Sequence, residues 1–158
     1  MNPFLRVPTV ADYEAITTWI PDAVACSRWA GPLLRFPFTA QELPELLLVP
    51  KSHSFCMVNS SGIPMGFGQF WPHSEQTVHL GRILVSPTSR GNGFGKILCT
   101  LLISEALETT NAEKITLRVY RDNAKALAIY SSLGFLIDAS ENDKDVILML
   151  ATTQQLRL

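Results

Sequence analysis

A run of small and basic residues near the middle of the chain has the composition of an anion-binding loop. Gly91, Gly93 and Gly95 stand at alternate positions, where the backbone must turn tightly or approach a ligand closely, and Arg90 and Lys96 flank them. An amphipathic segment follows, so the loop would open a helix whose first N–H groups and positive dipole end favour a phosphate. A glycine-rich connector with two solvated basic residues is the alternative interpretation.

Two common phosphate-binding motifs do not fit this loop. The interval from Gly91 to Lys96 is one residue too short for a P-loop, and Ile97 stands where that motif needs a serine or threonine to bind magnesium. The glycine spacing also differs from the dinucleotide-binding fingerprint, whose third glycine comes later. The loop therefore predicts an anion site of another type.

A second polar pattern lies further along the chain, between residues 123 and 135. Asn123 and Tyr130 are seven residues apart, so on a helix they share one face, two turns from each other. Asn123 can serve a ligand or simply cap the helix. Tyr130 can act chemically or can be a buried core tyrosine with one hydrogen bond. The pattern marks a candidate site and leaves both roles open.

The elements that must position these residues are those of a mixed sheet with helices. Periodicity predicts strands at 5–7, 55–59, 65–71, 77–85, 114–120, 135–137 and 146–150, and helices between 9 and 21 and at 22–30, 41–48, 93–109 and 123–133. Strands joined by short turns should pair antiparallel, whereas the central strand–helix–strand order predicts one parallel pair. We expect an α+β fold with a mixed, mostly antiparallel, twisted sheet flanked by helices.

Length and composition limit the class of protein. The chain has 158 residues, 47% of them hydrophobic, which suffices for one domain with a substantial core, and we expect a single domain over 1–158. A net charge of −1 without basic blocks argues against nucleic acid as a partner. No apolar run is long enough to span a membrane, and the N-terminus lacks a signal segment, so a cytoplasmic location is expected.

The cysteines and histidines do not predict a metal site, because their spacing matches no metal-ligand pattern. Cys26, Cys56 and Cys99 are far apart in the chain, and we expect reduced, mostly buried thiols. A reactive Cys99 near the ligand is the alternative for that residue.

Together the two polar patterns resemble the GNAT superfamily of N-acetyltransferases. The family's acetyl-coenzyme A loop, Arg/Gln-x-x-Gly-x-Gly/Ala after a strand, is matched by Arg90, Gly93 and Gly95. GNAT proteins also commonly carry an Asn, an Ala, a Tyr seven residues past the Asn, and then Gly-Phe, which matches 123–135. The resemblance is specific from about 78 to 135 and looser upstream. It implies a GNAT-like fold, with acetyl-coenzyme A (acetyl-CoA) as cosubstrate and no metal.

The resemblance assigns the cosubstrate to the glycine loop and the strand before it. Loop N–H groups should hold the pyrophosphate, and the pantetheine arm should pair with the end of the strand, where the family's two central strands splay apart. A freed N–H of Leu84 or Val85 would then stabilise the oxyanion. The implied cofactor-binding residues are Ile83, Leu84, Val85, Arg90, Gly91, Asn92, Gly93, Phe94, Gly95, Lys96 and Asn123.

The resemblance also implies the chemical roles. Tyr130 corresponds to the family's general acid, which protonates the departing thiolate. His79 matches a position that holds a glutamate base in the histone-acetyltransferase branch, and a neutral imidazole could take the amine proton directly or through a water. A strand histidine with a structural bond is the alternative. Arg118 stands where family members often have another glutamate, which leaves the identity of the base open.

The expected acceptor is a primary amine of a small molecule or of a protein N-terminus. It should enter between the first helices and the central strands, against Trp29 and Gly31. The implied activity is that of an N-acetyltransferase, an acyltransferase that transfers groups other than aminoacyl groups, by direct attack in a ternary complex. A catalytically weak acyl-CoA sensor and an interaction domain of the same fold are the alternatives. A homodimer is an expectation from the family only.

Overall fold

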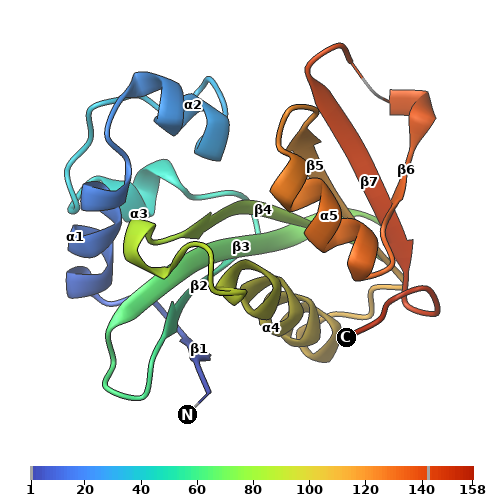
Figure 1. Ribbon diagram of the computed structural model, residues 1–158, viewed down its shortest axis with the longest axis horizontal. Helices are drawn as coiled ribbons and strands as arrows, with labels where there is room; N and C mark the ends of the chain where they lie inside the picture. The colour runs from blue at the N-terminus through green and yellow to red at the C-terminus, as the bar shows by residue number, and fades with distance from the viewer. Residues whose placement is uncertain (1, 142) are drawn as a thin grey trace.

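The computed structural model describes residues 2–141 and 143–158. The helices are α1 Val10–Trp19, α2 Ala23–Ala30, α3 Leu43–Leu46, α4 Phe94–Thr109 and α5 Ala124–Ser132, with short 3₁₀ turns at Pro87–Ser89 and Ala139–Glu141. The strands are β1 Phe4–Arg6, β2 His53–Val58, β3 Pro64–Ser74, β4 Thr77–Val85, β5 Lys114–Tyr120, β6 Leu136–Ile137 and β7 Val146–Thr152. Figure 1 shows how they follow one another along the chain.

The described strands form one seven-stranded sheet in the order β1-β2-β3-β4-β5-β7-β6. Neighbouring strands are antiparallel except β4 and β5, which run parallel from Thr77 opposite Lys114 to Leu80 opposite Leu117. The parallel pair arises because α4 carries the chain back along one face of the sheet between β4 and β5 (Figure 1). The predicted α+β class with one central parallel pair is confirmed.

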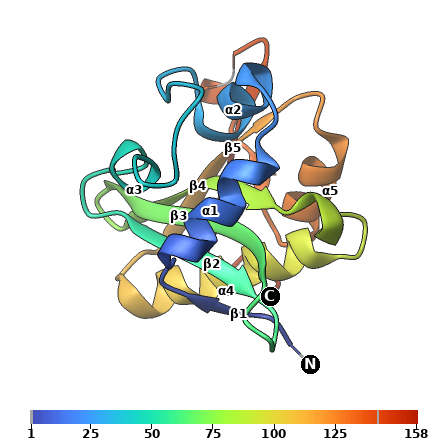
Figure 2. The same ribbon diagram turned by 90° about the vertical axis from the view of Figure 1, so that its left-hand side faces the viewer.

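Helices cover both faces of the sheet, and each face has its own hydrophobic core. On one face α4 and α5 pack through a cluster that includes Leu98 and Leu102. On the other face α1, α2 and α3 pack through Ile16, Leu43 and the β3 residue Phe67; Figure 2 shows α1 crossing in front of the strands. The apolar run in β3 is nearly unbroken because both faces of this strand are covered. Within the described part of the chain, no helix has the length and apolar character needed to cross a membrane.

The first helix begins with the predicted capping box. The N–H of Asp12 donates to Thr9 Oγ1 at 3.2 Å, and the N–H of Thr9 donates to the Asp12 carboxylate at 2.9 Å. Arg6 donates two further bonds to that carboxylate, at 2.7 and 3.1 Å, and so ties β1 to α1. Burial alone would raise the pKa of Asp12, but the bonds from Arg6 and Thr9 outweigh burial and lower it.

Two elements differ most from their predicted bounds. The helix predicted over 41–48 is reduced to Leu43–Leu46, because Pro44 lacks an N–H and fits only the first turn of a helix. The strand predicted to end at residue 71 continues to Ser74. The turn to β4 is therefore shorter than expected, and it needs Gln76 in the left-handed region, with a φ of 59°.

Candidate active site

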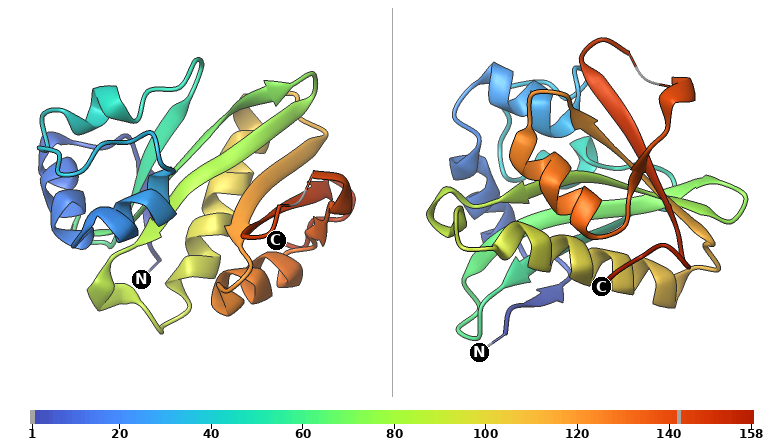
Figure 3. Two further views of the ribbon diagram at one scale, coloured as in Figure 1. Left: turned by 90° about the horizontal axis from the view of Figure 1, so that it is seen from above. Right: turned by 45° about the vertical axis from the view of Figure 1, so that its right-hand side comes forward.

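The central feature of the site is the point where β4 and β5 separate. Their pairing ends at Leu80 and Leu117, whereas β5 stays paired with β7 as far as Tyr120. On its other side β4 stays paired with β3 as far as Val85. The edge of β4 that faces β5 is therefore free of strand pairing over residues 81–85, and Figure 3 shows the two strands diverging there. Backbone groups on this edge are available to a ligand.

A β-bulge in β4 shapes the same segment. The single β3 residue Gly68 lies opposite two residues of β4, Arg82 and Ile83. Arg82 has a φ of 52°. The Arg82 Nη1 donates to the carbonyl oxygen of Leu47 at 2.9 Å and to Gln69 Oε1 at 3.0 Å. The Arg82 carbonyl accepts a 2.8 Å hydrogen bond from Trp29 Nε1. Partners in α2, in β3 and just after α3, on the face of the sheet covered by α1–α3, thus hold the bulge in place.

The glycine loop has the geometry of an anion site. Gly91 and Gly93 both have a φ of 81°, in the left-handed region, and a Cβ added at either would meet nothing within 4 Å. Gly93 is the N-cap of α4 and has no side chain to cap it, so the first N–H groups of this 16-residue helix lack a side-chain acceptor. Arg90 turns back to donate from Nε to the carbonyl oxygen of Val85 at 3.2 Å. The open loop and free donors fit a pyrophosphate.

A groove of about 480 Å³ runs along this loop and along β4. Seven of the predicted cofactor-binding residues line it: Ile83, Val85, Arg90, Gly91, Gly93, Gly95 and Asn123. The other four lie elsewhere. Leu84 lines a neighbouring cavity of about 550 Å³, Asn92 and Lys96 are exposed, and Phe94 packs against the core under α4.

Two residues of the groove carried little or no signal in the sequence. Lys125 lines it from the first turn of α5, two residues after Asn123. Cys99 lines the groove from α4, one helical turn after Gly95. Residues four apart share one face of a helix, so this spacing could have predicted that Cys99 lies on the groove side together with Gly95. The Cys99 thiol is buried, and burial raises its pKa to about 12, so it is a neutral thiol at physiological pH.

Tyr130 stands where the groove meets a smaller cavity of about 100 Å³ and lines both. Its side chain is 7% exposed and lines the groove together with the Cys99 thiol. Burial first, and then the neighbouring Cys99, raises the pKa of the Tyr130 hydroxyl. The hydroxyl therefore keeps its proton at neutral pH, which is the form a proton donor needs, although burial also makes it a weaker acid than an exposed tyrosine.

The smaller cavity opens on the other side of Tyr130, between α2 and the diverging strands. Trp29 and Arg28 come from α2, Arg82 from β4 and Arg118 from β5. Gly31, predicted beside Trp29, is not among the residues lining this cavity or the groove. Gly31 instead closes α2 with a φ of 85° and donates its N–H to the carbonyl oxygen of Ser27 at 2.8 Å.

His79 lies on β4 before the strands separate and lines neither cavity that contains Tyr130. Its Nδ1 is 2.8 Å from Thr116 Oγ1, and its ring packs beside Trp71 and His73. Burial first, and then the charges of His73 and Arg118, lowers the pKa of His79 to about 4. This histidine is neutral at physiological pH, and it is a weak base for an ammonium group.

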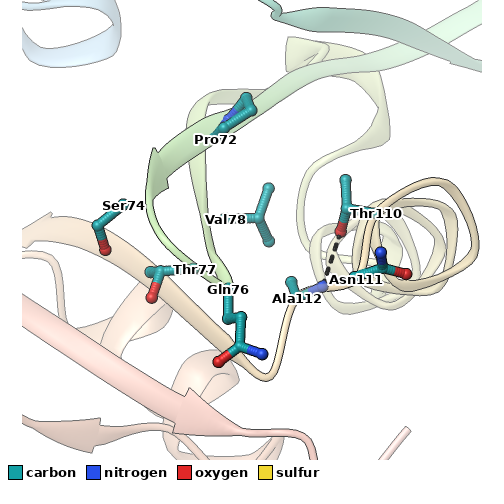
Figure 4. Close-up of a pocket in the computed structure, with 8 residues that line it drawn as sticks. All are labelled: Pro72, Ser74, Gln76, Thr77, Val78, Thr110, Asn111 and Ala112. Atoms are coloured by element: carbon teal, nitrogen blue, oxygen red, sulfur yellow. Dashed lines mark hydrogen bonds between the residues drawn. The ribbon is translucent and has the colours of Figure 1, made fainter.

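A separate cavity of about 190 Å³ lies at the opposite end of β4 and α4 from the glycine loop. Figure 4 shows its lining, with Gln76 from the β3–β4 turn, Val78 from β4, and Thr110, Asn111 and Ala112 after α4. All its lining side chains are uncharged.

Across residues 2–141 and 143–158, no group of three or more His, Cys, Asp or Glu side chains is placed to hold a metal ion. The groove beside Tyr130 is therefore the candidate active site.

The overall fold is similar to those of two N-acetyltransferases that were solved with coenzyme A. A spermidine N-acetyltransferase from Vibrio cholerae, solved with CoA and spermine, superposes with a TM-score of 0.79 at 20% identity, over 97% of this chain and 96% of that chain. The aminoglycoside acetyltransferase AAC(6')-Ib, solved with coenzyme A and kanamycin, superposes with a TM-score of 0.74 at 20% identity, over 98% and 96%.

Sequence comparison identifies the family. The model described as the acetyltransferase (GNAT) family matches residues 23–135, so this chain belongs to the GNAT acetyltransferase family. A UPF0039 protein of Schizosaccharomyces pombe is 32% identical over 79 residues, which are 49% of this chain and 50% of that protein. An N-acetyltransferase 9-like protein of Nematostella vectensis is 31% identical over 78 residues, 49% of this chain and 39% of its own length. The matches thus span half or less of these curated relatives.

Proposed function

We propose that this chain is an N-acetyltransferase that transfers the acetyl group of acetyl-CoA to a primary amine. The observation that carries the proposal is the position of Tyr130, which lines both the groove along the glycine loop and the cavity on the α2 side. A proton donor at that junction could serve a reaction between ligands in the two spaces. We also propose that residues 1–158 act as one catalytic domain, because both spaces are built from elements between α2 and α5.

The groove is the proposed site of acetyl-CoA, which supplies an activated acetyl thioester. Backbone N–H groups from Gly91 to Lys96 would hold the pyrophosphate, with Arg90 and Lys125 adding positive charge. The free edge of β4, at Ile83, Leu84 and Val85, would pair with the pantetheine arm. Asn123, whose side chain caps α5 by accepting from the N–H of Ala126 at 3.2 Å, lines both spaces.

The residues around the junction can manage the charge that the reaction creates. Tyr130 would protonate the departing thiolate, because its buried hydroxyl keeps its proton at neutral pH. A backbone N–H of Leu84 or Val85 would stabilise negative charge on the acetyl oxygen. Loss of a proton from the amine is proposed to occur through water, since the partly buried His79 lines neither space and is hydrogen-bonded to Thr116.

The α2-side cavity is the proposed acceptor site, with Trp29 as one wall. A sensor that binds acyl-CoA without catalysis is the second candidate, because the groove geometry alone would serve it equally well. Release of free coenzyme A thiol with a panel of primary amines separates the two. An N-acetyltransferase gives amine-dependent thiol release, whereas a sensor binds coenzyme A in calorimetry and releases none above the rate without amine.

A further inference from the structure

The two cavities that Tyr130 lines, and the 550 Å³ cavity next to them, are lined by cationic side chains and by no carboxylate. The smaller cavity is lined by Arg28, Arg82 and Arg118. The 480 Å³ groove adds Arg90 and Lys125, and the 550 Å³ cavity is lined again by Arg28 and Arg90. Neither aspartate nor glutamate occurs in any of the three linings. Phosphates of acetyl-CoA would account for Arg90 and Lys125, but not for the arginines on the acceptor side.

Arg82 is the key residue of this acceptor-side set. Its guanidinium is half-buried, and its Nη1 donates hydrogen bonds to the neutral oxygens of Leu47 and Gln69. Its Cζ lies 5.6 Å from the centre of the Trp71 ring. Among the described residues, no carboxylate forms a salt bridge with it. Burial lowers the pKa of Arg82, which reflects the cost of a desolvated cation without a counter-charge.

Arg28 and Arg118 each have a carboxylate partner outside the cavity lining. Arg28 forms a 2.6 Å salt bridge with Asp122 and stacks on Tyr120, with its Cζ 4.2 Å from the ring centre. Arg118 lies 3.9 Å from Glu141, and both of these side chains are about half exposed. Exposed pairs of this kind are weak, so both guanidinium groups could also contact an anion in the cavity. Three elements, α2, β4 and β5, thus bring positive charge to one small space.

We infer that the acceptor amine carries a carboxylate, bound by Arg82 with Arg28 and Arg118 at the rim, so that amino acids and related small amines fit this site better than polyamines. The inference rests on the proposed function and refines its substrate class. A planar guanidinium with a free edge matches a carboxylate bidentately, and a cavity of about 100 Å³ suits so small a group. A second ammonium group would instead face three like charges.

Three amines of matched skeleton test this inference directly. β-Alanine, β-alaninamide and 1,3-diaminopropane place a carboxylate, a neutral amide and a second ammonium at the same end of a short chain. With kcat/KM expressed per free amine, β-alanine is expected to exceed β-alaninamide by about 10- to 100-fold, the range for a charge-assisted hydrogen bond, and to exceed the diamine by more. Equal rates, or a preference for the diamine, would overturn the inference. The same three amines lengthened by one or two methylene groups should also be compared, in case the distance from the reacting carbon to the arginines requires a longer chain.

Variants identify the arginines responsible for the preference. Arg82→Gln and Arg118→Gln should each reduce the advantage of β-alanine over β-alaninamide. Arg82→Lys should keep only part of this advantage, because an ammonium group cannot bind a carboxylate through two parallel hydrogen bonds as a guanidinium does. Arg157→Gln is the matched control, since Arg157 is exposed and lines none of these cavities. If Arg82→Gln does not fold, Arg118→Gln, a change at an exposed residue, still measures the contribution of an arginine to this preference. A preference that is unchanged in Arg118→Gln and in every folded Arg82 variant would contradict the assignment.

Equilibrium binding separates this inference from the proposed function. With coenzyme A present at saturation, calorimetry should show β-alanine binding about 10-fold or more tightly than β-alaninamide, and only in the protein with Arg82 intact. If β-alanine binds in this way but no amine is acetylated, the carboxylate site stands and the proposed activity fails. If amines are acetylated with no effect of the carboxylate, the activity stands and the inference fails. Absence of both binding and transfer would overturn both.

Discussion

The indole Nε1 of Trp29 donates a 2.8 Å hydrogen bond to the carbonyl oxygen of Arg82, and this bond joins α2 to the bulge of β4. The indole also packs edge-on against Phe67, with ring centres 6.0 Å apart, and is tilted against Phe38 at 6.5 Å. Because Trp29 and Arg82 both line the smaller cavity, the bond fixes two of its walls relative to each other. The shape of the proposed acceptor site therefore depends on a contact between the first half of the chain and the central sheet.

Trp29→Phe is expected to keep most of the ring packing and to lose this bond. The Arg82 carbonyl would be left without its donor, which should lower the free energy of unfolding by about 1–2 kcal/mol. The KM for the amine should rise while the affinity for coenzyme A, whose proposed site is the groove on the other side of Tyr130, stays the same. Urea unfolding and steady-state kinetics check both effects. A KM equal to that of the wild type would show that Trp29 is not a wall of the acceptor site.

Asp12→Ala tests how strongly the first strand and helix are joined. The change removes the acceptor of the Thr9 N–H and of both Arg6 bonds at a fully buried position, so a loss of about 2 kcal/mol in unfolding free energy is expected. Asp22→Ala is the control, because Asp22 caps α2 through one exposed bond to the N–H of Ala25 and should cost about 1 kcal/mol or less. If denaturant titration shows the same loss of unfolding free energy in the two variants, the Arg6–Asp12 ion pair does not contribute to stability.

His79 should make the folded state sensitive to acid. Because its pKa falls from 6.5 to about 4 on folding, the unfolded chain binds the proton more readily between these values, and stability declines as the pH drops from about 6.5 to 4. The full effect is of the order of 3 kcal/mol. His79→Gln removes the titrating group and should flatten this part of the stability curve, whereas His53→Gln, at an exposed histidine that does not contribute to the shift, serves as the control.

The same His79→Gln variant decides between the two roles open to this histidine. A structural role predicts an unchanged shape of the pH profile of kcat/KM above pH 6.5, where the imidazole is already neutral in the wild type. A general base predicts a loss at neutral pH that shrinks at high pH, where the free amine is abundant. The geometry supports the first outcome.

Local patterns in the sequence predicted much of this fold. The capping box at Thr9, the strands at Thr77–Val85 and Lys114–Tyr120 and the helix after Gly93 follow from residue types within one or two turns. The left-handed Arg82 could not be predicted in this way, because no glycine or asparagine occupies that position. The bulge is instead held by the distant partners Leu47, Gln69 and Trp29.

The candidate site shows the same limit. The motif residues that line the groove were available from two short patterns, because a loop and a helix face are local features. Convergence of Arg28, Arg82 and Arg118 depends on packing α2 against a sheet in which β4 and β5 diverge, and no spacing in the sequence reports it. Gly31, predicted to face the acceptor, also ends α2, where its φ of 85° favours a residue without a Cβ, so a local helix end can account for this glycine.

Binding of coenzyme A should depend on positive charge at the groove. Lys125→Gln is expected to weaken coenzyme A by up to about 10-fold and to reduce the salt dependence of its affinity. Lys144→Gln, at an exposed lysine outside the groove lining, is the control. Calorimetry at two salt concentrations gives both quantities, and identical values for the two variants would place the phosphates elsewhere.

Gly93→Val tests the phosphate loop itself. A valine side chain at this position should block close approach of the pyrophosphate and so abolish coenzyme A binding. Since Gly93 has a φ of 81°, a β-branched residue there is strained even in open space, at a cost of roughly 1–3 kcal/mol. A fall in Tm should therefore accompany the loss of binding. Asparagine tolerates this φ better than valine, so Gly93→Asn should keep more of the wild-type Tm and still lose coenzyme A if the side chain blocks the pyrophosphate.

The most direct test of the account is the turnover of Tyr130→Phe. This change keeps the buried ring and removes only the hydroxyl, so coenzyme A should bind within about twofold of the wild type, while kcat for acetyl transfer to a primary amine falls by about 100-fold. Tyr13→Phe, which removes a hydroxyl from a half-buried tyrosine outside both spaces, should leave kcat unchanged. Thiol release that depends on the amine and collapses in Tyr130→Phe alone is the predicted result. Equal kcat in Tyr130→Phe and the wild type would contradict the assignment of Tyr130 as the proton donor.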